Sequence, residues 1–317
     1  MKHLTLRTIQ CLALLGSGGL CLSAPAQDEQ QLDTAEPVTA MATETNQNKL
    51  PMPFTAGWAH QFNTHVDGGG NFSITRFRFG LGLPAQLNDQ FYLATTVKYQ
   101  LDAYNFGGGI DPWGNIETLT LASFLQYRPD EQWMWYGGPI MRTAVEEGAN
   151  WSDGTRGGGL LAANFVADEN LSVGGGLLVM AQIKENALVL PIITLNWKFA
   201  DDWRLKVGMS DLATGGYGLD AVWDCCPDWQ LSFGGAYHKS RFRINGSGPT
   251  ADGIGQERAL TLTAAATWAP NKTFSATGFV GLATAGKLRL ENSGGNEIAD
   301  NDYDTAAILG VNAKINF

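Results

Sequence analysis

The sequence is poor in charge, lacks an excess of basic residues and contains only four cysteines. Of its 317 residues 16% are charged, and 21 Lys and Arg stand against 31 Asp and Glu, for a formal net charge of −10 at pH 7. Nucleic-acid binding needs a basic surface, so this balance argues against nucleic acid as a partner. With 44% hydrophobic and 10% aromatic residues, the chain carries too much apolar surface for general disorder.

Long hydrophobic runs and a disulfide framework are also missing. After the N-terminal region no stretch of 18 apolar residues occurs, which excludes helical membrane spans. Cys11 and Cys21 lie near the N-terminus, and Cys225 and Cys226 are adjacent, so paired cysteines cannot hold the fold together. For the adjacent pair, a vicinal disulfide, a bridge to a partner and a plain tight turn all remain open.

The N-terminus has the three parts of an export signal. Lys2 and Arg7 form a basic start, residues 11–22 form a short apolar segment, and Ala24-Pro25-Ala26 supplies a small-x-small cleavage pattern. The apolar segment is too short to span a bilayer. We therefore expect residues 1–26 to be a signal peptide that is removed.

The remaining chain divides once. Residues 27–53 are polar and acidic without periodicity, and we expect a flexible extension. Residues 54–317 show one repeated pattern. Segments of ten to sixteen residues alternate apolar and polar side chains, and turn-rich breaks separate the segments. Period-two alternation places these sets on opposite faces of a sheet. A soluble two-layer sandwich would show the same alternation.

The breaks between these segments are of two kinds that take turns along the chain. Six are short, and seven are mostly longer and rich in Gly, Asn and Asp, which predicts fourteen strands. An even strand count with short turns at one end and longer loops at the other is typical of bacterial outer-membrane barrels. The fold expected is all-β: a transmembrane, antiparallel, up-and-down β-barrel of about fourteen strands over residues 54–317.

Aromatic residues favour the membrane over a soluble sandwich. Seven of the ten tryptophans lie within four positions of a short turn, and rings of this kind prefer the bilayer–water boundary. They are Trp133, Trp135, Trp197, Trp203, Trp223, Trp229 and Trp268.

The last segment carries a specific resemblance. Residues 303–317 place five apolar side chains on one face, in the order Leu309, Val311, Ala313, Ile315 and the terminal Phe317. This pattern resembles the C-terminal assembly signal of bacterial outer-membrane β-barrel proteins. The resemblance implies localisation in the outer membrane, contact with its lipid and recognition of the last strand by the barrel-assembly machinery. More loosely, the chain is similar to an outer-membrane barrel family of unknown function, which supplies no activity.

If the apolar set faces lipid, the opposite set faces the lumen and contains many basic residues. A charge facing lipid near mid-membrane costs about 2–4 kcal/mol for Arg or Lys, which explains the inward placement. The predicted pore-lining residues are Arg76, Arg78, Lys98, Arg142, Lys184, Lys198, Arg204, Lys206, Lys287, Arg289 and Lys314. Asp102 and Asp220 are the clear inward acids. Rings of Arg and Lys bias a pore toward anions, although any wall that faces water carries charge.

Two segments conflict with this assignment. Phe72 and Ile74 are out of phase with the apolar residues that follow them, and Lys239, Arg241 and Arg243 share the phase of apolar residues earlier in their segment. Bulges, or strand tips that extend above the membrane, would explain both conflicts.

No catalytic, metal or cofactor site is predicted. His238 and Ser240 point to one face, but no family motif surrounds them, so ordinary strand residues are favoured. Asp300, Asp302 and Asp304 have the spacing of a calcium loop, but the Gly needed at the sharp turn is missing.

The function expected is therefore a passive or selective pore for small polar solutes, with anions favoured, and not an enzyme. The alternative is a closed barrel that acts in surface binding or envelope structure through its acidic loops. A soluble periplasmic all-β binding protein is a third interpretation.

Overall fold

The computed structural model describes residues 50–247 and 250–317, most of them in strands. The expected signal peptide and most of the expected extension lie outside these residues. The elements are β1 (Pro53–His65), β2 (Asn71–Gln86), β3 (Phe91–Gly107), β4 (Ile116–Tyr127), β5 (Trp133–Glu146), α1 (Trp151–Gly154), β6 (Thr155–Val166), β7 (Leu171–Met180), β8 (Leu188–Ala200), β9 (Trp203–Met209), β10 (Tyr217–Cys226), β11 (Trp229–Arg243), β12 (Ile254–Trp268), β13 (Phe274–Glu291), β14 (Glu297–Tyr303) and β15 (Ala306–Asn316). In the described part of the chain no helix is long and apolar enough to cross a membrane.

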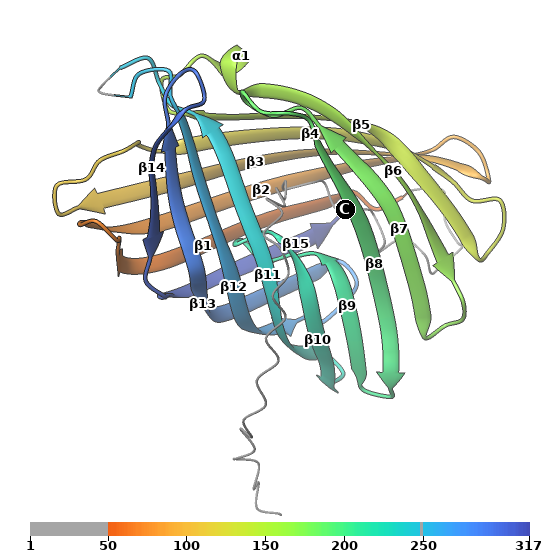
Figure 1. The fold of residues 1–317 in the computed structure, drawn as a ribbon. Helices are drawn as coiled ribbons and strands as arrows, with labels where there is room; N and C mark the ends of the chain where they lie inside the picture. The colour runs from red at the N-terminus through yellow and green to blue at the C-terminus, as the bar shows by residue number, and fades with distance from the viewer. Residues whose placement is uncertain (1–49, 248–249) are drawn as a thin grey trace, which may run out of the picture.

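The strands form one closed antiparallel barrel (Figure 1). Each strand pairs with its neighbours in the chain, and β1 pairs with β15 from Pro53↔Asn316 to Gln61↔Ile308, which closes the sheet. β14 and β15 both pair with β13 and follow each other along it, so they act as one interrupted strand. The barrel therefore has fourteen strands around its wall, and the predicted fold class is confirmed.

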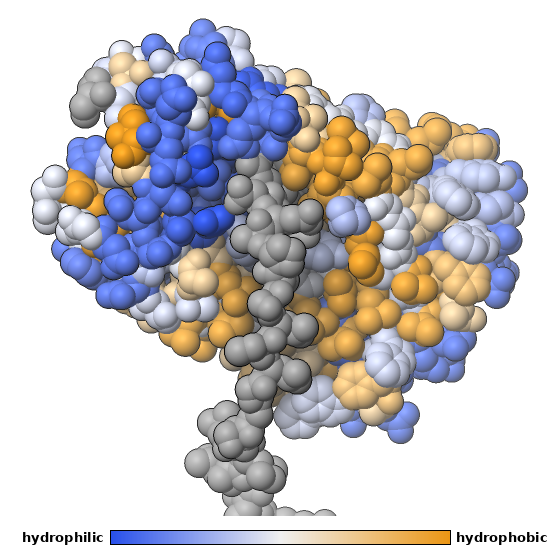
Figure 2. Space-filling view, viewed as in Figure 1, coloured by the Kyte–Doolittle hydropathy of each residue, from blue (hydrophilic) through white to orange (hydrophobic). Residues whose placement is uncertain are grey.

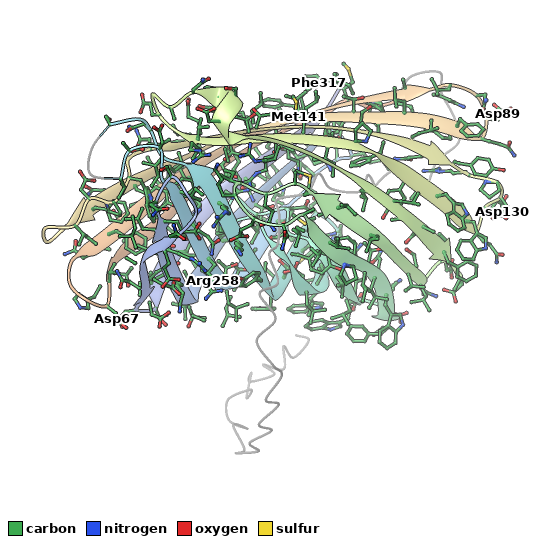
Figure 3. All side chains as sticks on the ribbon, turned by 45° about the horizontal axis from the view of Figure 1, so that its top comes forward. Asp67, Asp89, Asp130, Met141, Arg258 and Phe317 are labelled. Atoms are coloured by element: carbon green, nitrogen blue, oxygen red, sulfur yellow. The ribbon has the colours of Figure 1, made fainter. Side chains whose placement is uncertain are left out.

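The two ends of the barrel differ as the turn chemistry predicts. Asp89 and Asp130 mark short turns at one end, and Asp67 lies in a loop at the other end (Figure 3). The start of β1 meets the C-terminal residue at the short-turn end, where Met52 and Phe317 exchange two backbone hydrogen bonds of 3.1 Å. In bacterial outer-membrane barrels the short turns face the periplasm and the longer loops face outward. We name the two ends periplasmic and extracellular accordingly.

The outer surface is apolar around the wall. Leu161, Val280 and Val311 on three different strands expose 66%, 61% and 55% of their surface, and Figure 2 shows apolar residues spread over the wall. Trp133 and Trp135 are exposed near the periplasmic turn that contains Asp130, where rings gather in Figure 3. Closure pairs the first strand with the last, whose unpaired backbone groups would each cost several kcal/mol among acyl chains. A closed wall with an apolar exterior is typical of a β-barrel that spans a membrane.

At the extracellular ends of β11–β13 the basic side chains lie on the outer face of the sheet. A bulge at Ala285, with φ of 49°, shifts the register between β12 and β13. Below it Val280 and Leu282 face outward, whereas above it Leu288 is buried inside. There Lys287 stands opposite Arg258 in the strand register, and both side chains lie on the outer face. Hydrophilic residues gather over this region in Figure 2.

The bulge at Ala285 contradicts part of the predicted pore lining. Lys287 and Arg289 were predicted to face inward by counting parity along an unbroken strand, but the extra residue turns both to the outer face. The segments that conflicted in phase keep continuous registers in β2–β3 and β11–β12. A bulge does lie opposite Phe72 and Ile74, between Gln61 and Thr64, but its extra residue belongs to β1 and leaves the phase of β2 unchanged. Phe72 and Ile74 are completely buried inside the barrel. The out-of-phase residues thus mark strand ends where the interior is apolar.

The barrel wall is low on one side. β8 pairs with β9 only from Leu195 onward, and β10 pairs with β11 only as far as Tyr237. The tip of β11 turns inward instead, and its Arg243 pairs with Val145 of β5 in parallel. The outer face of this tip therefore lies opposite the inner face of β5–β7.

Candidate functional site

The extracellular half of the interior is filled by side chains from β1–β3 and β11–β15, which we call the filled sector. Aromatic rings form its upper part: the rings of Phe72 and Tyr303 lie 4.9 Å apart, and those of Trp113 and Phe242 lie 5.2 Å apart. Trp113 comes from the β3–β4 loop and is only 3% exposed. This loop folds inward, so aromatic packing obstructs the mouth on this side.

Below the rings lies a buried ion-pair network. Nη2 of Arg76 donates to both carboxylate oxygens of Glu257 at 2.8 and 2.9 Å, and its Nη1 donates to Asp102 at 3.3 Å. The hydroxyls of Tyr104 and Tyr303 donate to the same Glu257 carboxylate at 3.1 and 3.3 Å. All five residues are at least 91% buried. Arg76 therefore joins β2 to β12 across the interior, and its charge is compensated.

The β9–β10 loop, residues 210–216, also enters the barrel, and we call it the lumen loop. Its Thr214 carbonyl accepts a hydrogen bond from Arg78 Nη2 at 3.2 Å, and its Asp211 carbonyl accepts one from Asn312 Nδ2 at 3.1 Å. Ala213 and Thr214 are almost completely buried. The missing side chain of Gly57 makes room for Ala213, because a Cβ on Gly57 would lie 3.1 Å from the Ala213 Cβ. The loop is thus held against β1, β2 and β15.

The periplasmic half of the inner face is basic, and we call it the basic wall. Residues directly opposite in an antiparallel pair share a face, and the registers place six basic and two acidic side chains inward here. The basic residues are Arg78, Lys98, Lys198, Arg204, Lys206 and Lys314, and the acids are Asp220 and Asp224. Arg204 and Asp224 form an ion pair of 2.8 Å, and Lys206 stands opposite Asp220.

A pocket lies where the tip of β11 faces the inner side of β5–β7, and we call it the seam pocket. Four basic side chains line it: Arg142, Arg156, Lys239 and Arg241. Among the described residues that line it none is acidic, and the others include Ala144, Met180, Ala181 and Ile183. The pocket encloses about 460 Å³ of open space, including solvent at its mouth.

The structure distributes the eleven predicted pore-lining residues over four places. Arg76 lies in the ion-pair network, and Arg142 lies in the seam pocket. Lys184 is in the β7–β8 loop rather than in a strand, and Lys287 and Arg289 lie on the outer face. The structure brings the other six together on the basic wall: Arg78, Lys98, Lys198, Arg204, Lys206 and Lys314.

Sequence reasoning missed Glu257, Arg156 and the role of Lys239 and Arg241. Glu257 meets Arg76 from 181 residues away, and no local pattern signals such a contact. The basic residues of β11 did carry a signal, because their phase conflicted with an outward, lipid-facing strand. That conflict marked the strand end that folds into the barrel.

The residues of the weaker candidate sites make ordinary structural contacts. The His238 ring faces Glu257 at 3.7 Å, and Ser240 accepts from Arg142 Nη2 at 3.4 Å, so both belong to the buried interior. Asp300 and Asp302 pair with Lys287, and no cluster of three or more metal-ligating side chains occurs in residues 50–247 and 250–317. Cys225 and Cys226 are free thiols with their Sγ atoms 3.6 Å apart.

Comparison with known proteins finds no matching family model and no matching curated protein. Among solved structures, an outer membrane channel from Pseudomonas putida F1 is similar, with 13% identity and a TM-score of 0.47, over 86% of this chain and 97% of that one. A Pseudomonas aeruginosa FadL homologue has 11% identity and a TM-score of 0.43, over 84% and 89% of the two chains. The KdgM porin in complex with disordered oligogalacturonate has 10% identity and a TM-score of 0.32, over 81% and 97%. At this level of similarity no solute is transferred to the present chain.

Proposed function

We propose that this barrel is an outer-membrane channel for small anionic solutes, and that the arrangement described here is its closed state. The basic wall carries the proposal, because six inward Lys and Arg stand against two inward acids in the periplasmic half of the inner face. Cationic linings lower the energy of an anion in a pore and raise that of a cation. No step of covalent chemistry belongs to this function.

Opening requires a path past the filled sector, and the lumen loop is the part best suited to move. It spans residues 210–216 and accepts hydrogen bonds from Arg78 and Asn312, whereas the filled sector is fastened by a buried ion-pair network. A neutral hydrogen bond contributes about 0.5–1.5 kcal/mol net, and one to a charged group about 1.5–3 kcal/mol. Displacement of the loop would connect the basic wall with the seam side of the barrel.

Conductance across a planar bilayer tests the proposal. In a KCl gradient the full chain is expected to give a reversal potential near the equilibrium potential of chloride. Lys198→Glu with Lys206→Glu is expected to shift the reversal potential toward the equilibrium potential of potassium. Potassium preference in the wild type, or an unchanged reversal potential in the double variant, would contradict anion selectivity.

A matched pair of variants tests the gate. Asn312→Ala removes a lumen-loop anchor and is expected to raise the open probability, whereas Asn316→Ala, on the same strand, removes a comparable bond to the Lys272 carbonyl at the periplasmic rim and is expected to leave it unchanged. Equal behaviour of the two variants would remove the loop from the mechanism.

A closed barrel that works through its extracellular loops is the second candidate function. The filled sector favours it, because aromatic and ion-paired side chains occupy the extracellular half of the interior. Absence of current in the wild type and in both the gate and the charge variants, with folded barrels confirmed by heat-modifiable gel migration, would favour this function over a channel.

A further inference from the structure

The basic wall lies directly beside the point where the chain enters the barrel. We propose that residues 27–49, the acidic segment that precedes β1, dock along the basic wall and compete there with anionic solutes. The docking does not require that the barrel conducts, whereas the competition rests on the proposed function. The segment is thus a tethered occupant of the periplasmic half of the barrel interior.

One row of paired residues places two lysines of the basic wall on either side of β1. Lys98 of β3 stands opposite Gly80 of β2, and Gly80 stands opposite Thr55 of β1. Thr55 in turn stands opposite Lys314 of β15. Neighbouring strands lie about 4.8 Å apart, so the two lysines flank Thr55 at a spacing of about 14 Å along the wall. The row lies only two residues beyond Pro53, where β1 begins, so the segment reaches the barrel next to these lysines.

Three lysines of the basic wall have charge that is available to an acidic segment. Lys98, Lys198 and Lys314 form no ion pair with any other residue in the described part of the chain. Lys198 is exposed, and the other two are half-buried, so solvent reaches all three on the inner face. The two inward acids stand instead beside Arg204 and Lys206. Carboxylates of the segment would therefore meet lysines that no described acid occupies.

The segment matches the basic wall in charge and in length. Its 23 residues contain five carboxylates, one basic residue, Lys49, and no aromatic side chain. The carboxylates are Asp28, Glu29, Asp33, Glu36 and Glu44. A chain spans at most about 3.3–3.6 Å per residue, so the segment can extend over about 75 Å. The apolar band of an outer-membrane barrel is about 25 Å tall, and the segment is therefore long enough to reach every lysine of the basic wall.

The covalent link to β1 makes these weak attractions effective. A single exposed ion pair is weak, but a segment joined to the barrel by a short chain has an effective concentration of about millimolar or more at the wall. Walls of low dielectric constant also focus the field of the lysines on an anion between them. A solute anion meets the same field without a tether, so carboxylates held at the lysines would exclude it.

Zero-length carbodiimide cross-linking tests the docking. The chain from Gln27 onward is placed in nanodiscs that hold one copy each, and new amide bonds between carboxylates and lysines are located by peptide mass spectrometry. Cross-links from residues 28–44 to Lys98, Lys198 or Lys314 are expected in low salt. Their yield is expected to fall at least about fivefold in 1 M NaCl, where the Debye length is only about 3 Å. Absence of these cross-links, or equal yields at both salt concentrations, would overturn the docking.

Matched charge variants test the competition with solutes. The segment variant combines Asp33→Asn, Glu36→Gln and Glu44→Gln. The control makes the same three changes at exposed carboxylates of periplasmic turns, in Asp89→Asn, Glu131→Gln and Glu169→Gln. At 0.1 M KCl the segment variant is expected to pass at least about twofold more chloride current than the wild type, and this difference is expected to shrink at 1 M KCl because salt screens the attraction. An unchanged current in the segment variant, or an equal rise in the control, would overturn the competition.

Failure of the docking and failure of the channel give different results. Cross-links to the basic wall, together with no anion-selective current in any variant, support the docking and reject the channel. Anion-selective current without these cross-links supports the channel and rejects the docking. Cross-links that reach only Lys272, in the turn between β12 and β13, would place the segment outside the barrel and would also reject the docking.

Discussion

The filled sector and the seam pocket use arginine in opposite ways. In the filled sector Arg76 faces Glu257 and Asp102, and two tyrosine hydroxyls complete the same network. In the seam pocket Arg142 and Arg156 lie near Lys239 and Arg241, and the rest of the described lining is apolar or neutral. The residue type is shared, but the surroundings differ: Arg76 joins strands through buried carboxylates, whereas the arginines of the seam pocket stand among other basic side chains.

Removal of one carboxylate from each region should break this comparison most visibly. Glu257→Gln leaves Arg76 buried without its main partner and is expected to lower the free energy of unfolding by about 3–5 kcal/mol. Glu185→Gln, next to the seam pocket, removes a partly exposed partner of Arg241 and is expected to cost no more than about 1 kcal/mol. Urea unfolding in lipid vesicles measures both, and equal losses would show that the network is not structural.

Simultaneous removal of the three charges sharpens the same point. In Arg76→Met with Glu257→Leu and Asp102→Asn no buried charge of the Arg76 ion pairs is left uncompensated, and apolar replacement of buried ion pairs is often neutral or stabilising. The triple variant is expected to recover at least about 2 kcal/mol relative to Glu257→Gln in the same unfolding experiment. A triple variant as unstable as the single one would mean that the hydrogen bonds from the tyrosines, not the ion pairs, dominate.

Packing at the seam pocket predicts an intermediate effect. A Cβ on Gly158 would collide with the Met180 side chain and the Val179 carbonyl, whereas the adjacent Gly157 has open space. Gly158→Ala is expected to lower stability by about 1–3 kcal/mol, and Gly157→Ala is expected to have no such effect. Thermal unfolding compares the pair, and similar melting temperatures would show that β6 and β7 are not closely packed there.

The exposed ion pair of the basic wall predicts the smallest effect on stability. Arg204 and Asp224 keep 25% and 32% of their side-chain surface exposed, and such pairs contribute about 0–1 kcal/mol. Asp224→Asn is expected to change the free energy of unfolding by less than about 1 kcal/mol while increasing chloride preference in bilayer recordings. A larger loss of stability would place this pair with the filled sector rather than with the water-facing wall.

The barrel itself could be predicted because its signals are local. Period-two alternation, turn residues and tryptophans near short turns all act within about one strand length, and they identified the fourteen strands and the apolar exterior. The fate of individual charges depends on long-range contacts instead. Arg76 and Lys98 look alike in the sequence, but one meets a carboxylate from β12 and the other lines the basic wall.

The candidate site could be predicted only in outline for the same reason. Parity and strand register place Lys206 and Lys314 on the same face as their strand partners, whereas at Lys287 one added residue in β13 reverses the faces. Lys184 was counted as part of a strand, although β7 ends at Met180. The seam pocket arises because β9 and β10 are short and the tip of β11 folds inward, a shape that no single segment specifies.

The bulge at Ala285 makes the upper part of β13 sensitive to length in a way that composition does not reveal. Deletion of that one residue would exchange the environments of every side chain beyond it, bringing Lys287 and Arg289 inside and turning Leu288 and Leu290 toward water. Many substitutions along this stretch should be harmless, yet a change of a single codon in length should prevent assembly. Homologous sequences aligned across this point should therefore vary freely in residue type while keeping their spacing constant.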